Sequence, residues 1–138
     1  MSAVSITITN AASELERVSA LADEFAVAHR LPSDVIADLH VALEEVLTNI
    51  IKYGYTDNGP HEISIQLSIE DGMLVANIED DGRPFDPLKV PEPDVKASLR
   101  ERGVGGLGIH FVRKLMNQVS YRRLADRNRL EFRKHLHS

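Results

Sequence analysis

Residues 63–82 read ISIQLSIEDGMLVANIEDDG, and this stretch decides the class of fold. Isoleucine and leucine alternate with serine and glutamine over 63–69, which is typical of a strand with one buried face. Asp71-Gly72 is a favoured two-residue hairpin turn, and a second apolar face follows over 73–79. Strands joined by so short a turn run antiparallel, so the stretch predicts a β-hairpin.

A strand and a helix are predicted at the N-terminal end. Apolar and polar residues alternate over 4–8, which indicates the strand. Ser13 and Glu16 have the S-x-x-E spacing of a capping box. Apolar residues then recur at helical spacing, so the helix should run to about His29.

A second helix is predicted between that first helix and the hairpin. Ser33 or Asp34 should cap its beginning, and Gly54 should end it. Its apolar stripe consists of Val35, Leu39, Ala42, Leu43, Val46 and Ile50.

The part of the chain after the hairpin begins with a long loop. Residues 83–102 contain four prolines and many charges, and a loop of this length inside a domain is often a lid or a binding loop. The pattern then predicts a helix over 107–116 and two strands, over 119–123 and 129–134. A turn is expected at 126–128.

The order of these elements is β-α-α-β-β-loop-α-β-β. Hairpins outnumber crossovers, so the sheet should be mixed and mainly antiparallel, with helices covering one face. The sequence therefore predicts an α+β fold, a two-layer α/β sandwich. A length of 138 residues favours one domain over 1–138.

Composition and charge narrow the classes of function. The formal net charge of −5 disfavours a nucleic-acid partner, and the basic residues near the C-terminus read as a solvated hairpin face. The absence of cysteine excludes disulfides and thiolate metal sites. Since the sequence has neither a signal-peptide pattern nor an apolar run of about 20 residues, we expect a cytoplasmic protein with no membrane contact.

Three features could carry chemistry, and the first is a polar pair on the second helix. Glu45 and Asn49 are four residues apart, so their side chains lie one above the other at the edge of the apolar stripe. An amide oxygen can bind Mg²⁺, and a nearby carboxylate can accept a proton. The spacing alone more often marks a solvated helix edge. His40 and Glu44, also four apart, read as an exposed pair rather than a metal site.

The second feature is Asp80-Asp81-Gly82 at the end of the return strand. Asp80 has the same inward parity as Leu74, and a buried carboxylate is costly without a partner. The exocyclic amine of adenine would be a suitable donor, and Gly82 would let the backbone approach a flat base. An ordinary Asp-Gly turn after a strand is the alternative.

The third feature is the glycine-rich segment 103–108, which reads GVGGLG and leads into a helix. Backbone N–H groups at a helix N-terminus bind phosphates, and glycines let such a ligand come close. A flexible hinge is the alternative. The segment is neither a P-loop nor a Rossmann fingerprint, because no G-K-[ST] follows and no strand precedes it.

The three features occur in an order that resembles the GHKL ATPases, the superfamily of gyrase, histidine kinases and mismatch-repair ATPases. The stretch 45–55 resembles their N-box, 80–82 the first glycine box and 106–109 the second. The small size and the stretch GGLGIHFVRKLMNQVSY look most similar to the anti-sigma-factor serine/threonine kinases, over about 13–133. The resemblance implies a Bergerat-type, histidine-kinase-like ATP-binding fold.

The resemblance also implies a role for each matching residue. Asn49 would coordinate Mg²⁺ on the ATP phosphates, and Glu45 would be the general base for a protein hydroxyl. Asp80 would bind the adenine amine, and Gly82 would make room for the ring. The remaining nucleotide contacts would lie under a mobile lid and come from Arg102, Gly105, Gly106, Leu107 and Gly108.

Two functions follow from the resemblance. The first is an ATP-dependent kinase that phosphorylates serine or threonine on a small antagonist of an anti-sigma factor. The alternative is an ATP-loaded switch that sequesters a sigma factor or another regulator with little catalysis. Glu45 favours the kinase, since sequestration alone needs no base. The resemblance leaves open whether a sigma factor is bound and whether the chain forms a homodimer.

Overall fold

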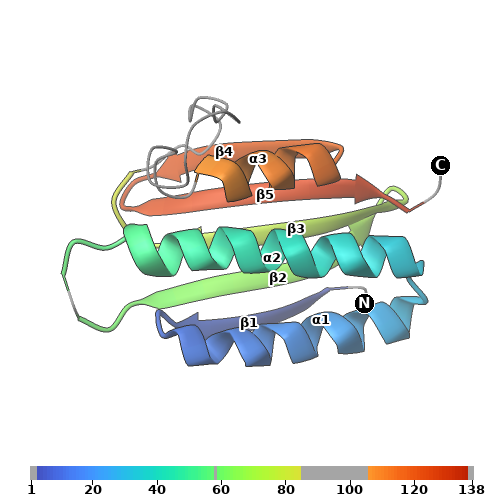
Figure 1. Cartoon of the computed structure of the whole chain (residues 1–138), viewed down its shortest axis with the longest axis horizontal. Helices are drawn as coiled ribbons and strands as arrows, with labels where there is room; N and C mark the ends of the chain where they lie inside the picture. Colours follow the sequence, from blue (N-terminus) through green and yellow to red (C-terminus); the bar gives the residue numbers. More distant parts are fainter. Residues whose placement is uncertain (1–2, 58, 85–105, 137–138) are drawn as a thin grey trace.

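The computed structural model describes residues 3–57, 59–84 and 106–136. The order of the elements confirms the predicted one, and Figure 1 shows the helices on the same face of the sheet. The elements are β1 (Val4–Thr9), the 3-10 turn η1 (Ala12–Glu14), α1 (Leu15–His29), α2 (Ser33–Tyr53), β2 (Glu62–Glu70), β3 (Met73–Asp80), α3 (Gly106–Leu115), β4 (Gln118–Leu124) and β5 (Arg127–His135).

The sheet has five strands in the order β1-β2-β3-β5-β4, and each neighbouring pair is antiparallel. The predicted α+β sandwich with a mainly antiparallel sheet is therefore confirmed. Ile78 of β3 lies opposite Ile65 of β2 on one side and Leu130 of β5 on the other. This register lines up apolar side chains across the central strands, on the side that the helices cover.

One of the two predicted hairpin turns is confirmed and the other is displaced. Asp71 and Gly72 both have positive φ, 51° and 74°, as a two-residue turn of the primed type requires. The β4–β5 turn lies at Ala125 and Asp126, with Ala125 at φ 55°, and not at 126–128. The prediction was wrong because the polar residues after Asp126 belong to β5, where Arg127 already pairs with Leu124.

The predicted capping box is not formed. Ser13 lies inside η1, and α1 begins at Leu15 without a side-chain cap. The Glu14 carboxylate accepts hydrogen bonds from the backbone N–H of Thr9 at 3.2 Å and from the Arg17 guanidinium at 3.0 Å. Glu14 thus ties β1 to the start of α1.

The beginning of α2 also differs from the prediction. Pro32 is the N-cap residue, in an extended conformation, and neither Ser33 nor Asp34 provides a side-chain cap. The Pro32 carbonyl accepts the N–H of Ile36 at 3.0 Å and so starts the helical ladder. Proline suits this place, because its fixed φ is compatible with the turn that precedes a helix.

One hydrophobic core joins the helices to the sheet. Its largest fully buried side chains include Phe25 of α1, Leu39 and Leu47 of α2, and Phe132 of β5. Lys134 of β5 fixes the end of α3, because its Nζ donates to the Leu115 carbonyl at 2.7 Å. The same Nζ lies 2.9 Å from the Asp38 carboxylate of α2, so the ammonium group of Lys134 connects both helices to the sheet. These two contacts fix the C-terminal end of α3 and the first half of α2 relative to the sheet.

Two further expectations concern membranes and the lid. Within 3–57, 59–84 and 106–136, no helix has the length and apolar composition to cross a membrane. Residues 85–102, which are all but the first two residues of the predicted loop, lie outside the described residues.

Candidate functional site

The three features singled out from the sequence lie at the same end of the molecule. In Figure 1, α2 runs towards the end of the sheet where β3 finishes, and α3 begins at that same end. The helices α2 and α3 are in contact. The second half of α2, the Asp80–Gly82 segment and the first turn of α3 are therefore brought together by the topology.

Glu45 and Asn49 lie one above the other on α2, and both are partly exposed. The Asn49 side-chain N–H donates to the backbone carbonyl of Glu45 at 2.7 Å. This bond uses the amide nitrogen and fixes its orientation, so Oδ1 is the atom left to bind a ligand. A fixed amide oxygen next to a solvent-accessible carboxylate fits a hard cation and a proton acceptor.

Asp80 is a buried carboxylate with a specific set of partners. Only 4% of the residue is exposed, which confirms its inward parity. Its Oδ1 accepts the N–H of Gly82 at 2.8 Å and a side-chain N–H of Asn128 at 3.1 Å. Burial raises the pKa of Asp80, while these two hydrogen bonds oppose that shift. Its Oδ2 accepts no hydrogen bond from the described residues, so it can receive a donor from a ligand.

Gly82 is required by a close backbone approach that the sequence did not reveal. A Cβ on Gly82 would lie 2.4 Å from the Gly54 carbonyl oxygen and 2.8 Å from Asp80 Oδ1. The Gly54 carbonyl also accepts the N–H of Arg83 at 2.8 Å, and the Arg83 side chain donates to the Tyr53 carbonyl at 2.9 Å. The end of α2 is thus bonded directly to the segment after β3. The predicted role of Gly82 beside a flat base remains a prediction.

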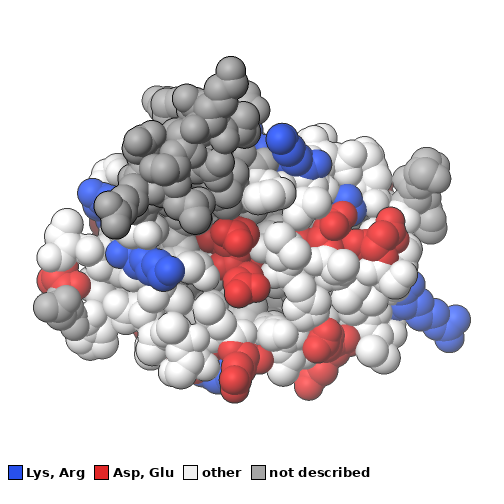
Figure 2. Space-filling view, in the orientation of Figure 1, with Lys and Arg blue, Asp and Glu red and all other residues white. Residues whose placement is uncertain are grey.

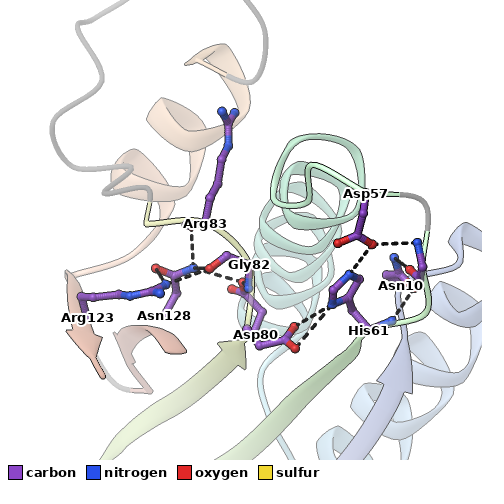
Figure 3. Close-up of polar contacts among 10 residues, drawn as sticks. Asn10, Asp57, His61, Asp80, Gly82, Arg83, Arg123 and Asn128 are labelled. Carbon is purple, nitrogen blue, oxygen red and sulfur yellow. Dashed lines mark hydrogen bonds and ion pairs between the residues drawn. The ribbon is translucent and has the colours of Figure 1, made fainter. Parts of the chain in front are cut away.

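Asn128 is the residue that the sequence reasoning missed, since it was assigned to a turn. It lies on β5 opposite Asp80 and is 7% exposed. Its side-chain N–H groups reach Asp80 Oδ1, the Gly82 carbonyl at 3.3 Å and the Arg83 carbonyl at 2.9 Å (Figure 3). Its Oδ1 accepts from Tyr121 and from Arg123, and Arg123 also donates to the Gly82 carbonyl at 2.8 Å. One buried amide therefore shapes the whole Asp80–Arg83 segment.

We expect Asn128→Ala to lower the free energy of unfolding by about 3 kcal/mol, because it leaves several buried polar groups without partners. Urea denaturation measures this change. Gln66→Ala is the matched control, because Gln66 is an exposed amide on the neighbouring part of the sheet. Equal stabilities of the two variants would contradict the role given to Asn128.

The glycine-rich segment is described only in part. α3 begins at Gly106, so Gly106, Leu107 and Gly108 form its first turn, as a phosphate site at a helix N-terminus would require. Arg102 and Gly105 lie outside the described residues. The predicted contacts of these five residues with a nucleotide remain predictions.

The predicted pairing of His40 with Glu44 is wrong. His40 Nε2 lies 2.7 Å from the Asp23 carboxylate of α1, and Nδ1 lies 3.4 Å from the Ser19 hydroxyl. The packing of α1 against α2 provides these partners, which a single-helix spacing rule cannot anticipate. In the part of the chain that the structure describes, no group of three or more histidine and acidic side chains could hold a metal ion.

Comparisons with known proteins agree with this geometry. The family model described as histidine kinase-like ATPase domain matches residues 8–134. The serine/threonine-protein kinase BtrW of Bordetella bronchiseptica is 29% identical over 135 residues, which cover 98% of this chain and 90% of that protein. The serine-protein kinase RsbW of Oceanobacillus iheyensis is 36% identical over 92 residues, 61% of this chain and 56% of that protein.

A solved structure shares the fold. The RsbU and RsbW domains of a Mycobacterium tuberculosis protein match with a TM-score of 0.67 at 14% identity, over 99% of this chain and 32% of that chain. The chain thus covers nearly all of BtrW, little more than half of the RsbW protein and a third of the solved chain.

Proposed function

The chain belongs to the family of histidine kinase-like ATPase domains, and we propose that it is an ATP-dependent protein kinase whose substrate is a serine or threonine on a small antagonist protein. ATP is the nucleotide that the family implies. The observation that carries the proposal is the partly exposed pair Glu45 and Asn49, at the end of the molecule that also holds the buried Asp80. Two relatives are named as protein kinases, which supports the same reaction.

The reaction needs a proton acceptor near the γ-phosphate. A bond forms between the acceptor oxygen of the protein substrate and the γ-phosphorus, while the bond from that phosphorus to the bridging oxygen breaks and ADP leaves. The hydroxyl proton passes to the Glu45 carboxylate. Most of the catalysis in phosphoryl transfer comes from positioning and charge neutralisation, so the chain needs little more than a base, nucleotide contacts and a bound cation.

Asn49 is the residue that would hold Mg²⁺, since its amide is oriented with Oδ1 available. Bound Mg²⁺ would neutralise charge on the ATP phosphates. We expect Asn49→Ala to remove most of the increase in ATP affinity that Mg²⁺ causes, while binding without Mg²⁺ changes by less than about threefold. Calorimetry with and without Mg²⁺ measures both. An unchanged Mg²⁺ effect in the variant would contradict the assignment.

The proposed function is tested by transfer of label from γ-³²P-ATP. The acceptor is the antagonist-like protein that co-purifies with the chain and is identified by mass spectrometry. We expect slow labelling of that protein on serine or threonine, and weak ATP hydrolysis without it. If the acceptor binds in the presence of ATP and stays unlabelled, the sequestering switch is the better description.

Other expectations about partners stay predictions. A bound sigma factor and a homodimer belong to this group. A cytoplasmic location and a single domain over 1–138 also stay predictions. Figure 2 shows several acidic side chains over the middle of the helix-covered face, with basic side chains towards its margins. A polyanion would be repelled there, which supports the expectation that nucleic acid is not a direct partner.

A further inference from the structure

His61, immediately before β2, is bonded to two aspartates from different segments. Its Nε2 lies 2.9 Å from the Asp57 carboxylate (Figure 3). Its Nδ1 lies 3.2 Å from the Asp81 carboxylate. The side chain is only 19% exposed. The ring stacks on Tyr55, with centroids 4.1 Å apart and planes inclined by 12°. None of these contacts was predicted from the sequence.

The two contacts require a particular protonation state. An ionised carboxylate only accepts hydrogen bonds, and a neutral imidazole has a single N–H. Both contacts can be hydrogen bonds only if both ring nitrogens carry protons, so the geometry calls for an imidazolium. When the ring loses a proton, one carboxylate loses its donor and the two aspartates keep their negative charges beside a neutral ring.

These contacts connect the α2–β2 loop to the nucleotide site. Asp81 lies between Asp80 and Gly82, the residues proposed to receive adenine. The backbone N–H of His61 donates to the Asn10 side chain at 3.1 Å, and the backbone N–H of Asn10 donates to the His61 carbonyl at 3.0 Å. These two bonds fix the backbone of His61, from which the ring projects. The opposite side of the segment is held by Asn128, as described above. His61 is thus the second support of the Asp80–Gly82 segment.

We propose that His61 is a positioning residue of the nucleotide site, which as an imidazolium holds Asp81 in place and makes nucleotide affinity fall as the ring loses its proton. The inference rests on the proposed function, since it assumes that the Asp80–Gly82 segment binds the base.

The direction of the pH dependence follows from the groups that face the ring. The hydrogen bond with Asp57, and then that with Asp81, raise the pKa of His61 above its usual value, although partial burial opposes them. Tyr55 does not interfere, because burial, followed by the charges of Asp80 and Asp81, raises the pKa of its hydroxyl. The imidazolium is therefore complete below the usual histidine pKa, and its effect is lost as pH rises through the raised value.

The test compares ADP affinity by calorimetry from about pH 6 to about pH 9, because histidine ordinarily titrates between about pH 5 and 8 and the pKa of His61 is raised. The proteins are the wild type, His61→Gln and His40→Gln. Glutamine keeps one donor and never carries charge, and His40 is the matched control because it also pairs with an aspartate, on α1. Titration of the ADP phosphate is common to all three proteins, so differences between their profiles isolate His61.

At the acidic end of this range, we expect the wild type to bind ADP about fivefold more tightly than His61→Gln, which is the lower end of the usual coupling between two sites. At the alkaline end, the two proteins should bind ADP with equal affinity. His40→Gln should follow the wild type throughout. A constant ratio between wild type and His61→Gln would overturn the inference and leave the proposed function standing. Absence of ADP binding by the wild type at every pH would overturn both.

A second measurement needs no variant. Because linkage is reciprocal, bound ADP must raise the pKa of His61 further, which NMR titration of the His61 ring resonances measures in the wild type. A pKa of His61 that is the same with and without ADP would overturn the inference even if His61→Gln failed to fold.

Discussion

Glu45→Gln is expected to slow phosphoryl transfer by about a hundred- to ten-thousand-fold, the range that general-base catalysis usually contributes. ATP affinity should change by less than about threefold, since the base contacts the acceptor hydroxyl and not the nucleotide in the ground state. The glutamine has almost the same shape as glutamate, so the loss would come from basicity rather than packing. Rapid-quench measurement of labelled acceptor gives the rate, and calorimetry gives the affinity.

Glu44→Gln provides the matched control. Glu44 is the preceding residue on α2 and is exposed. Glu44→Gln therefore changes the net charge of the protein by the same amount as Glu45→Gln. Its transfer rate should equal that of the wild type. If both variants transfer label as fast as the wild type, Glu45 is not the base. If both are equally slow, the effect is one of net charge on α2.

The alternation of residues along the strands was the most informative part of the sequence. It predicted the β2–β3 hairpin and placed Asp80 on the buried side, where the residue is 4% exposed. A strand alternates strictly with a period of two, so a single apolar run determines the parity of every residue in it. The same rule could have found Asn128, which has the parity of Leu130 and Phe132 on β5, had the predicted strand over 129–134 been extended by one residue.

Partners that come from distant segments could not be predicted. The sequence offers no sign that His61 bonds to Asp81, or that Gly82 packs against the Gly54 carbonyl, because both contacts depend on where the segment between α2 and β2 meets the end of β3. His40 failed for the same reason, since its partner comes from α1. Polar side chains pair according to tertiary geometry, whereas apolar ones only need a common face.

Helix beginnings were the other source of error. Spacing rules identify residues that are able to cap a helix. Because more than one residue near Ser13 and near Ser33 satisfies these rules, they do not identify the first residue of either helix. In the structure Glu14 and Pro32 are the N-cap residues, and neither makes a side-chain cap bond. Neither error moved a functional residue, since Glu45 and Asn49 lie in the second half of α2.

Asp80→Asn is expected to weaken ATP binding by about a hundredfold, consistent with losing a hydrogen bond to a buried charged group. The position of Oδ1 is occupied by an acceptor that receives the N–H of Gly82 and an N–H of Asn128. In the variant the amide oxygen must take that place, so its NH₂ group replaces Oδ2. That group would then point a donor at the exocyclic amine of adenine, which is also a donor.

The same exchange should change base preference. Guanine has a carbonyl oxygen where adenine has its amine, so the amide introduced by Asp80→Asn could donate to it, while the wild-type carboxylate repels it. We therefore expect the ratio of ATP to GTP affinity to fall in this variant, beyond the loss in ATP affinity itself. Competition of both nucleotides against a fluorescent ADP analogue measures this ratio.

The free energy of unfolding of Asp80→Asn should respond differently from its affinity for ATP. Burial raises the pKa of Asp80, which means that the fold favours the neutral carboxyl group over the charged one. The stabilisation that comes from the neutral form is complete below the usual aspartate pKa and is lost as pH rises through the raised value. Removing the charge should leave the free energy of unfolding at neutral pH within about 1 kcal/mol of the wild type, or above it. Glu79→Gln is the control, as Glu79 neighbours Asp80 with the opposite parity on β3. If Asp80→Asn bound ATP as tightly as Glu79→Gln does, adenine would not be recognised by Asp80, because a well-folded protein without this acceptor would still hold the base.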